Sequence, residues 1–196
     1  MMNKKLRKMI TVSIFGVVSF IIMQIEFPLG IFPDFLKFDF SDVVALIIGF
    51  SFGPISGVGV ELIKNLLHLL MTKTAGIGEM ANFLIGSVFV YTAAFIYVKN
   101  KSKYGAFISL IIGTLVFSLF AGLLNYYVLL PLYEKALKFP ISAIVGIASK
   151  VNSLVKDKWT LILFSIIPFN IFKGIFASIV TILLYKRLSP IIKKYS

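Results

Sequence analysis

The chain alternates between long apolar runs and short polar or basic segments. Four of the runs, at about residues 9–27, 79–98, 104–130 and 159–185, are long enough to be membrane-crossing helices, since a hydrocarbon core of about 30 Å needs ~20 mainly apolar residues. The runs are continuous, whereas the strands of a membrane β-barrel alternate polar and apolar positions. The pattern therefore predicts an all-α, polytopic membrane protein.

The segment at 42–71 is also apolar but is interrupted by Gly53-Pro54. Ser41 or Asp42 can cap its first half as a helix, and the Gly-Pro pair ends that helix. Each half is short for a membrane crossing, so the segment is either two short spans or one broken span. Two spans place 11 Lys and Arg residues inside and 7 outside, against 10 and 8 for one span. The positive-inside rule therefore favours six transmembrane helices with both termini cytoplasmic.

Composition supports the same class. Hydrophobic residues make up 59% of the 196 residues and charged residues 14%, with a mean hydropathy of +0.98, and a soluble domain of this length cannot cover so much apolar surface. In the six-span arrangement the net charge of +12 lies mostly on cytoplasmic flanks, facing anionic lipid rather than nucleic acid. With no Cys and a single His, the sequence predicts neither disulfides nor a transition-metal site.

The N-terminal segment joins a basic start to an apolar run, as a signal peptide does. No cleavage site of the A-x-A type follows, so we expect a retained first span. No linker or change of composition divides the chain, which predicts one six-helix transmembrane domain over residues 1–196. Before the last span, the apolar residues of 141–155 follow helical spacing and predict a short interfacial helix.

Lys173 is the single charge in the run 159–185. A lysine at the bilayer centre costs roughly 2.5–3.5 kcal/mol on insertion scales, so it should face the bundle interior and have a partner. Asn170 lies on the same helix face, and Pro168 predicts a kink just before the pair. Two interpretations follow: a polar pocket that binds a ligand, or a structural lysine paired with Glu61.

Glu61, Lys64, Asn65 and His68 occupy positions i, i+3, i+4 and i+7, which form one polar stripe on a helix. As a proton relay, the stripe would indicate a stand-alone proton-coupled secondary permease that uses Glu61, Lys64 and His68. The plainer interpretation is an internal Glu61–Lys64 pair, or Glu61 as the partner of Lys173. We favour the plainer one, because no other span carries a mid-membrane acid that a relay could use.

Other polar and aromatic positions gather toward the outer ends of the predicted spans. Asn82 and Asn125 lie near these ends, and each alone is typical of a helix-packing amide, while Glu79 can cap its own helix. The loop at 28–42 mixes aromatic with charged residues, namely Phe35, Phe38, Phe40, Lys37, Asp39 and Asp42. Such a loop suits either a flat heteroaromatic ligand with polar edges or an aromatic belt at the membrane interface.

Enzymatic chemistry is not predicted. The sequence has no G-x-x-x-x-G-K-[ST] motif, so the chain is not expected to hydrolyse ATP itself. It also has no Ser–His–Asp arrangement, no H-E-x-x-H motif and no second histidine, which leaves an intramembrane enzyme little to work with.

Four segments together resemble a known family: "FLKFDFSDVVALIIGFSFGPISGVGVELIKNLLH", "GEMANFLIGS", "AGLLNYYVLLP" and "FNIFKG". They are similar to the substrate-binding (S) subunits of energy-coupling-factor (ECF) vitamin transporters, of the riboflavin-specific RibU type. The resemblance covers residues 27 to 180. It implies six helices with cytoplasmic termini, multi-pass insertion in a prokaryotic cell membrane, and no enzymatic activity.

The resemblance also implies a high-affinity riboflavin site near the outer face, under the loop that follows the first span. The residues expected to bind riboflavin are Leu36, Lys37, Phe38, Asp39, Asn125, Asn170 and Lys173, with Asn82 added from the polar outer end of its span. Riboflavin is then the transported ligand rather than a cofactor. FMN is a second candidate, because the Lys37 ammonium can bind a phosphate group on the ligand. The implied partners are a transmembrane coupling subunit and two ATPase subunits of an ECF module.

The first span departs from the family pattern in one respect. Relatives of this type dock to the coupling subunit through small residues spaced by four, ideally Ala-x-x-x-Ala. Here Ser13, Gly16 and Ser19 follow three-residue spacing. They still form a small-residue face that suits close helix approach, although the docking residues themselves are not identified.

Overall fold

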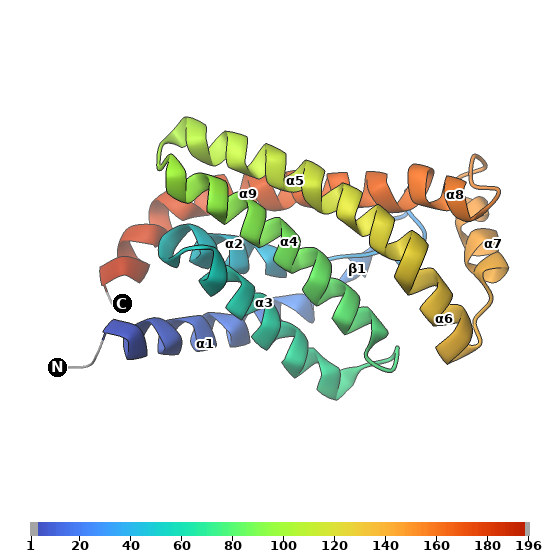
Figure 1. Ribbon diagram of the computed structural model, residues 1–196, viewed down its shortest axis with the longest axis horizontal. Coiled ribbons are helices and arrows are strands. Elements are labelled where there is room, and N and C mark those ends of the chain that lie inside the picture. Colours follow the sequence, from blue (N-terminus) through green and yellow to red (C-terminus); the bar gives the residue numbers. More distant parts are fainter. Residues whose placement is uncertain (1–3, 195–196) are drawn as a thin grey trace.

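The computed structural model describes residues 4–194 and the side chains of residues 5–188. It is a helical bundle, with 81% of residues in helices, and its long helices run side by side (Figure 1). The elements in chain order are α1 (Lys4–Met23), β1 (Phe27–Pro28), β2 (Lys37–Phe38), α2 (Ser41–Phe52), α3 (Pro54–His68), the 3-10 turn η1 (Leu69–Met71), α4 (Ile77–Lys99), α5 (Lys103–Leu124), the π turn η2 (Asn125–Leu129), α6 (Leu130–Leu137), α7 (Ile141–Val151), α8 (Lys158–Leu161), the π turn η3 (Ile162–Ile166) and α9 (Ile167–Lys194). Lys4, Lys193 and Lys194 of the charge count lie outside the described side chains.

Four helical stretches in the described part of the chain are long and apolar enough to cross a membrane: Lys5–Met23, Ile77–Lys99, Lys103–Leu137 and Lys158–Leu188. The shorter helices α2 and α3 meet at Gly53, whose φ of +92° is a conformation that favours glycine. Pro54 occupies the first turn of α3, where its missing N–H breaks no helical bond. The predicted break at Gly53-Pro54 is therefore confirmed as a junction between two helices.

Two ends differ from the prediction. α1 stops at Met23 rather than at residue 27, because the chain turns there and Phe27 pairs with Phe38 in the antiparallel β1–β2 ladder. The N-cap of α2 is Phe40 rather than Ser41 or Asp42. The side chain that serves the first turn of α2 comes from outside the helix, since Asp39 Oδ1 accepts the Ser41 N–H at 2.8 Å.

Two of the long stretches contain a π turn just before a proline. η2 precedes Pro131 and η3 precedes Pro168. A proline removes an N–H donor and crowds the preceding turn, and the wider π turn accommodates it within a continuous helical stretch. Where the sequence predicts a kink just before Asn170 and Lys173, the chain forms the π turn η3, and the stretch predicted to end at residue 130 continues to Leu137.

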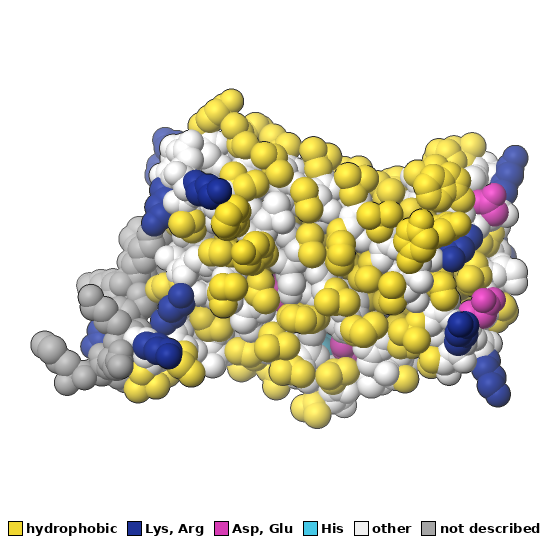
Figure 2. Space-filling view, in the orientation of Figure 1, with side chains coloured by type: hydrophobic (Ala, Val, Ile, Leu, Met, Phe, Trp, Pro, Cys, Tyr) yellow, Lys and Arg dark blue, Asp and Glu magenta, His cyan; other side chains and the backbone are white. Residues whose placement is uncertain are grey.

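The core surrounds α2, where every residue from Ser41 to Phe50 is buried against α1, α3, α4 and α9. A smaller apolar cluster packs α7 against α8 and the neighbouring end of α6. The helix predicted over 141–155 is confirmed as α7, but it ends at Val151, because the backbone becomes extended at Asn152. Exposed apolar side chains cover the middle of the molecule, and Lys and Arg gather toward its two ends (Figure 2). This distribution matches a bundle surrounded by lipid.

The small-residue face of α1 is used inside the bundle. An added Cβ at Gly16 would lie 2.6 Å from Ile63 Cγ2 of α3. Ser19 is fully buried, and its hydroxyl donates to the carbonyl of Ser41 at 2.9 Å. Of the three small residues, only Ser13 is exposed, so the face expected for external docking instead brings α1 close to α2 and α3.

Candidate functional site

A cavity of about 530 Å³ opens between the loop that precedes α2 and the helices α4, α5, α6, α7 and α9. Its volume lies within the range typical of small-molecule sites. Six of the eight predicted site residues line it: Leu36, Lys37, Asn82, Asn125, Asn170 and Lys173. These residues come from four separate parts of the sequence, and the fold brings them together around one cavity.

The remaining wall is mostly apolar and aromatic. The residues that sequence reasoning did not assign to the site include Phe35, Ile85, Phe117, Tyr133, Phe139, Ile144 and Phe169, together with Lys73 and Thr74 from the α3–α4 connection. Aromatic rings beside a few polar groups suit a flat ligand with polar edges. Of the three loop phenylalanines considered for this role, only Phe35 lines the cavity.

Phe38 and Asp39 lie behind the cavity wall. Phe38 is buried, and its ring centroid lies 5.0 Å from that of Phe40 and 6.0 Å from those of Phe172 and Phe176 on α9. Asp39 is also buried and contacts α2 and α9. The loop thus presents Leu36 and Lys37 to the cavity and anchors itself through the next two residues.

The Lys173 ammonium has two carboxylate partners. Its Nζ lies 2.9 Å from Asp39 Oδ2 and 3.2 Å from Asp42 Oδ2. Glu61, the partner considered from the sequence, is not one of them: Lys173 lies in α9 beside the first turn of α2, and Glu61 pairs with Lys64 instead. Asp42 also lines the cavity. The sequence offers it as a helix cap and as one of the charged residues of the 28–42 loop, but not as a partner of Lys173, although an acid at the start of a buried helix is a signal for a buried cation.

Lys64 continues the charge network on the side away from the cavity. Its Nζ lies 2.7 Å from Asp42 Oδ1, 2.7 Å from Glu61 Oε2 and 3.0 Å from Ser41 Oγ, and all of these groups are buried. The predicted internal Glu61–Lys64 pair is therefore confirmed. The network joins α2, α3 and α9 at the floor of the cavity.

His68 belongs to a different cluster. Its Nδ1 lies 2.9 Å from Glu79 Oε1, and Glu79 Oε2 accepts the Thr72 hydroxyl at 2.9 Å. Among the described side chains, no hydrogen bond joins His68 to Lys64 or Glu61. The polar stripe of α3 therefore belongs to two separate groups of contacts rather than one relay. Glu61 and Lys64 are part of the ion network under the cavity, and His68 helps to hold the α3–α4 connection.

The two central amides are partly committed to their own helices. Asn125 Nδ2 donates to the Ala121 carbonyl and Asn170 Nδ2 donates to the Ile166 carbonyl, both at 2.8 Å. A carboxamide has two N–H donors and an oxygen with two lone pairs. Each amide therefore retains a donor and an acceptor for a ligand in the cavity.

Comparison with known proteins identifies the family. The family model for the substrate-specific component of ECF transporters matches residues 7–185. The chain is 41% identical over 188 residues to "Riboflavin transporter RibU" of Staphylococcus aureus (strain TCH60), covering 96% of this chain and 93% of that protein. It is 35% identical over 193 residues to "Riboflavin transporter FmnP" of Bacillus subtilis (strain 168), covering 97% and 96%.

The fold agrees. A solved structure described as "Structure and mechanism of the S component of a bacterial ECF transporter" superposes with a TM-score of 0.76 at 38% sequence identity, covering 97% of this chain and 99% of that one. The chain is therefore a multi-pass membrane protein that belongs to the family of substrate-specific components of ECF transporters.

Proposed function

We propose that this chain is the riboflavin-binding S component of an ATP-driven ECF uptake transporter. The observation that carries the proposal is the cavity in which Asn125, Asn170 and Lys173 meet aromatic walls, in a chain that is 41% identical to a riboflavin transporter. The chain then captures the vitamin and performs no chemistry on it.

The chemistry of the cavity suits a flavin. The imide edge of the isoalloxazine ring presents an acceptor, a donor and another acceptor. Asn125 and Asn170 each retain both a donor and an acceptor, and Lys173 adds an ammonium N–H for a ring carbonyl or a ribityl hydroxyl. Phe35 and the other apolar walls cover the faces of the ring. Burial of most of a flat ligand with matched polar groups favours tight binding.

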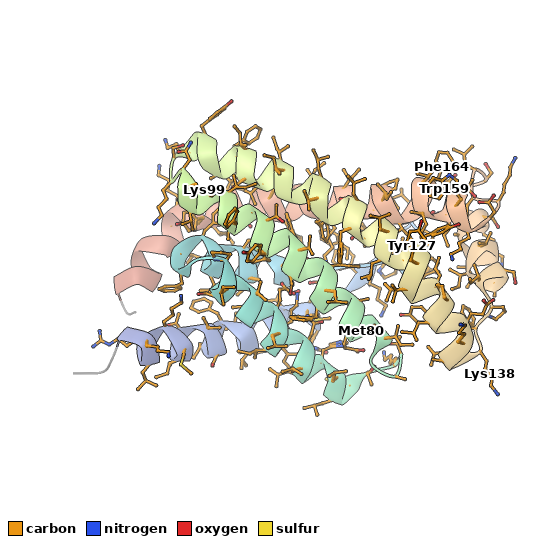
Figure 3. The ribbon with its side chains drawn as sticks, in the orientation of Figure 1. Met80, Lys99, Tyr127, Lys138, Trp159 and Phe164 are labelled. Carbon is orange, nitrogen blue, oxygen red and sulfur yellow. The ribbon has the colours of Figure 1, made fainter. Side chains whose placement is uncertain are left out.

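The proposed topology is a single domain of six transmembrane helices with both termini cytoplasmic. α1 begins and α9 ends at the same end of the bundle as the α4–α5 turn (Figure 1). Lys99 at this turn and Lys138 after α6 lie at opposite ends (Figure 3). Because Phe139, from the loop between α6 and α7, and Ile144 of α7 line the cavity, the cavity lies toward the end we assign to the outside.

Uptake then requires partners that hydrolyse ATP, because this chain has no nucleotide-binding motif. We propose a transmembrane coupling subunit and two ATPase subunits for this role. FMN is a second candidate ligand, since Lys37 lies at the cavity and a lysine is a suitable phosphate partner.

The test is purification of the full chain from membranes of cells grown with riboflavin. We expect a yellow preparation with close to one flavin per chain, which quenches the fluorescence of added riboflavin after the bound vitamin is removed. A colourless preparation that leaves the fluorescence of added riboflavin unchanged would reject the proposed function.

A further inference from the structure

Asp39 lies where the loop over the cavity joins α2 and faces α9. Its Oδ2 lies 2.9 Å from Lys173 Nζ. Its Oδ1 accepts the backbone N–H of Ser41 at 2.8 Å and also the Ser41 hydroxyl. The side chain is only 4% exposed and is not among the residues that line the cavity, so both of its oxygens are committed to the protein.

On the basis of the proposed function, we propose that Asp39 is a positioning residue: it fixes the Lys173 ammonium at the cavity wall and fastens the overlying loop to α9, without touching the ligand. The resemblance to the family suggested Asp39 as a ligand contact, and the geometry assigns it this different role.

The first part of the argument concerns the ammonium. A lysine ammonium has three N–H donors. The contacts with Asp39 and Asp42 occupy two of them and leave the third for the cavity. Asp42 is in turn held by Lys64 at 2.7 Å. A donor that is fixed before the ligand arrives loses less freedom on binding, which increases affinity.

The second part concerns the loop. Leu36 and Lys37 line the cavity, while Phe38 packs on Phe172 and Phe176, which flank Lys173 on α9. The Asp39–Lys173 ion pair is a second contact between the same loop and α9. The pair therefore positions two sets of ligand contacts at once, the ammonium on α9 and the residues of the loop.

A double-mutant cycle tests this role. Riboflavin affinity is measured by fluorescence quenching on the purified full chain for wild type, Asp39→Asn, Lys173→Met and the double variant. Asparagine keeps an oxygen that can accept the Ser41 N–H but removes the charge beside Lys173. We expect Asp39→Asn to weaken binding roughly tenfold and the double variant to bind no more weakly than Lys173→Met alone, since residues that act through one another are not additive. Asp34→Asn, at an exposed acid of the same loop, is the matched control and should bind as wild type.

Two outcomes overturn the proposal while leaving riboflavin binding in place. Additive losses in the cycle would mean that Asp39 acts independently of Lys173, as a direct ligand contact would. Wild-type affinity in Asp39→Asn would remove its role altogether. By contrast, a wild-type chain that binds no flavin refutes the proposed function itself.

A second measurement does not depend on the folding of the Asp39 variant. Amide hydrogen exchange of residues 35–38 is compared between ligand-free wild type and Lys173→Met. If the pair fastens the loop, exchange in this segment increases in the variant while exchange in α5 stays unchanged. Equal exchange in the loop of both proteins overturns the fastening role.

Discussion

Gly86 of α4 lies directly against the carboxylate of Glu61: an added Cβ at Gly86 would be 2.6 Å from Glu61 Oε2. The absence of a side chain at this position is what lets α4 cover the ion network beneath the cavity. The Glu61 carboxylate is fully buried and its charged partner is Lys64, at 2.7 Å, so a displacement here disturbs a contact that solvent cannot replace.

Gly86→Ala is therefore expected to destabilise the protein by about 1–3 kcal/mol, the usual range for overpacking a buried site. Thermal unfolding in detergent measures the effect as a lower midpoint. Gly146→Ala is the matched control: it lies in the middle of α7 with nothing within 4 Å of the added Cβ, and alanine is the better helix former. An unchanged midpoint for Gly86→Ala would contradict the close approach of α4 to Glu61.

Asn170→Leu tests the amide in the cavity. The two side chains have similar size, but leucine removes the donor and the acceptor that Asn170 retains beyond its bond to Ile166. A buried donor or acceptor of the ligand that is left without a partner weakens binding by about 1–3 kcal/mol. The riboflavin affinity should therefore fall by roughly tenfold or more in a fluorescence titration. Asn100→Ala, at the exposed end of α4, should leave the affinity unchanged. If Asn170→Leu binds riboflavin as tightly as Asn100→Ala and wild type, Asn170 does not contact the ligand.

Glu79→Ala tests the fastening of the α3–α4 connection. Glu79 is buried and holds His68, Thr72 and Thr74, and the neighbouring Lys73 lines the cavity. The substitution leaves these polar groups without their shared acceptor, which costs about 1–3 kcal/mol. We expect a lower unfolding midpoint and faster amide exchange over residues 69–76. If exchange in this segment matches wild type, another contact holds the connection.

The start of α8 provides a prediction about pH. The Thr160 N–H and hydroxyl donate to the exposed Asp157 carboxylate and hold its pKa below the usual range. Because the folded-state pKa is lower than the unfolded one, this cap contributes stability at neutral pH and loses it as the pH falls below about 4 toward the folded-state value. Asp157→Ala should therefore lower the unfolding midpoint at pH 7. A deficit relative to wild type that stays constant down to the lowest tolerated pH would argue against an ionised cap.

The apolar runs and the Gly and Pro positions that interrupt them predicted most of the helices, since both signals are local in the sequence. The Gly53-Pro54 pair marked the end of α2 and the start of α3, and Pro168 marked the distorted turn of the last stretch. The first span is predicted to reach residue 27, but α1 ends at Met23, because Phe27 pairs with Phe38 of β2 instead of continuing the helix. This pairing depends on residues 37 and 38, which lie in a separate segment further along the chain.

The cost of burying a charge was enough to single out Lys173, and Asn170 followed as the amide on the same helix face. The partner of Lys173 was a different question. Asp39 lies 134 positions earlier in the chain, and no periodicity links residues at that separation. Glu61 and Asp39 were equivalent choices by charge, and only the packing of α9 against the start of α2 distinguishes them.

The sequence by itself determined the class of protein, the positions of its long helices and the polar residues that need a partner when buried. It could do so because hydrophobicity and charge act at every position independently of the fold. The tertiary structure decided which of these residues share a wall, that Leu36 and Lys37 face the cavity while Phe38 and Asp39 hold the loop, and that Asp42 joins the site. These are consequences of contacts between distant segments, whose geometry exists only once the helices have packed.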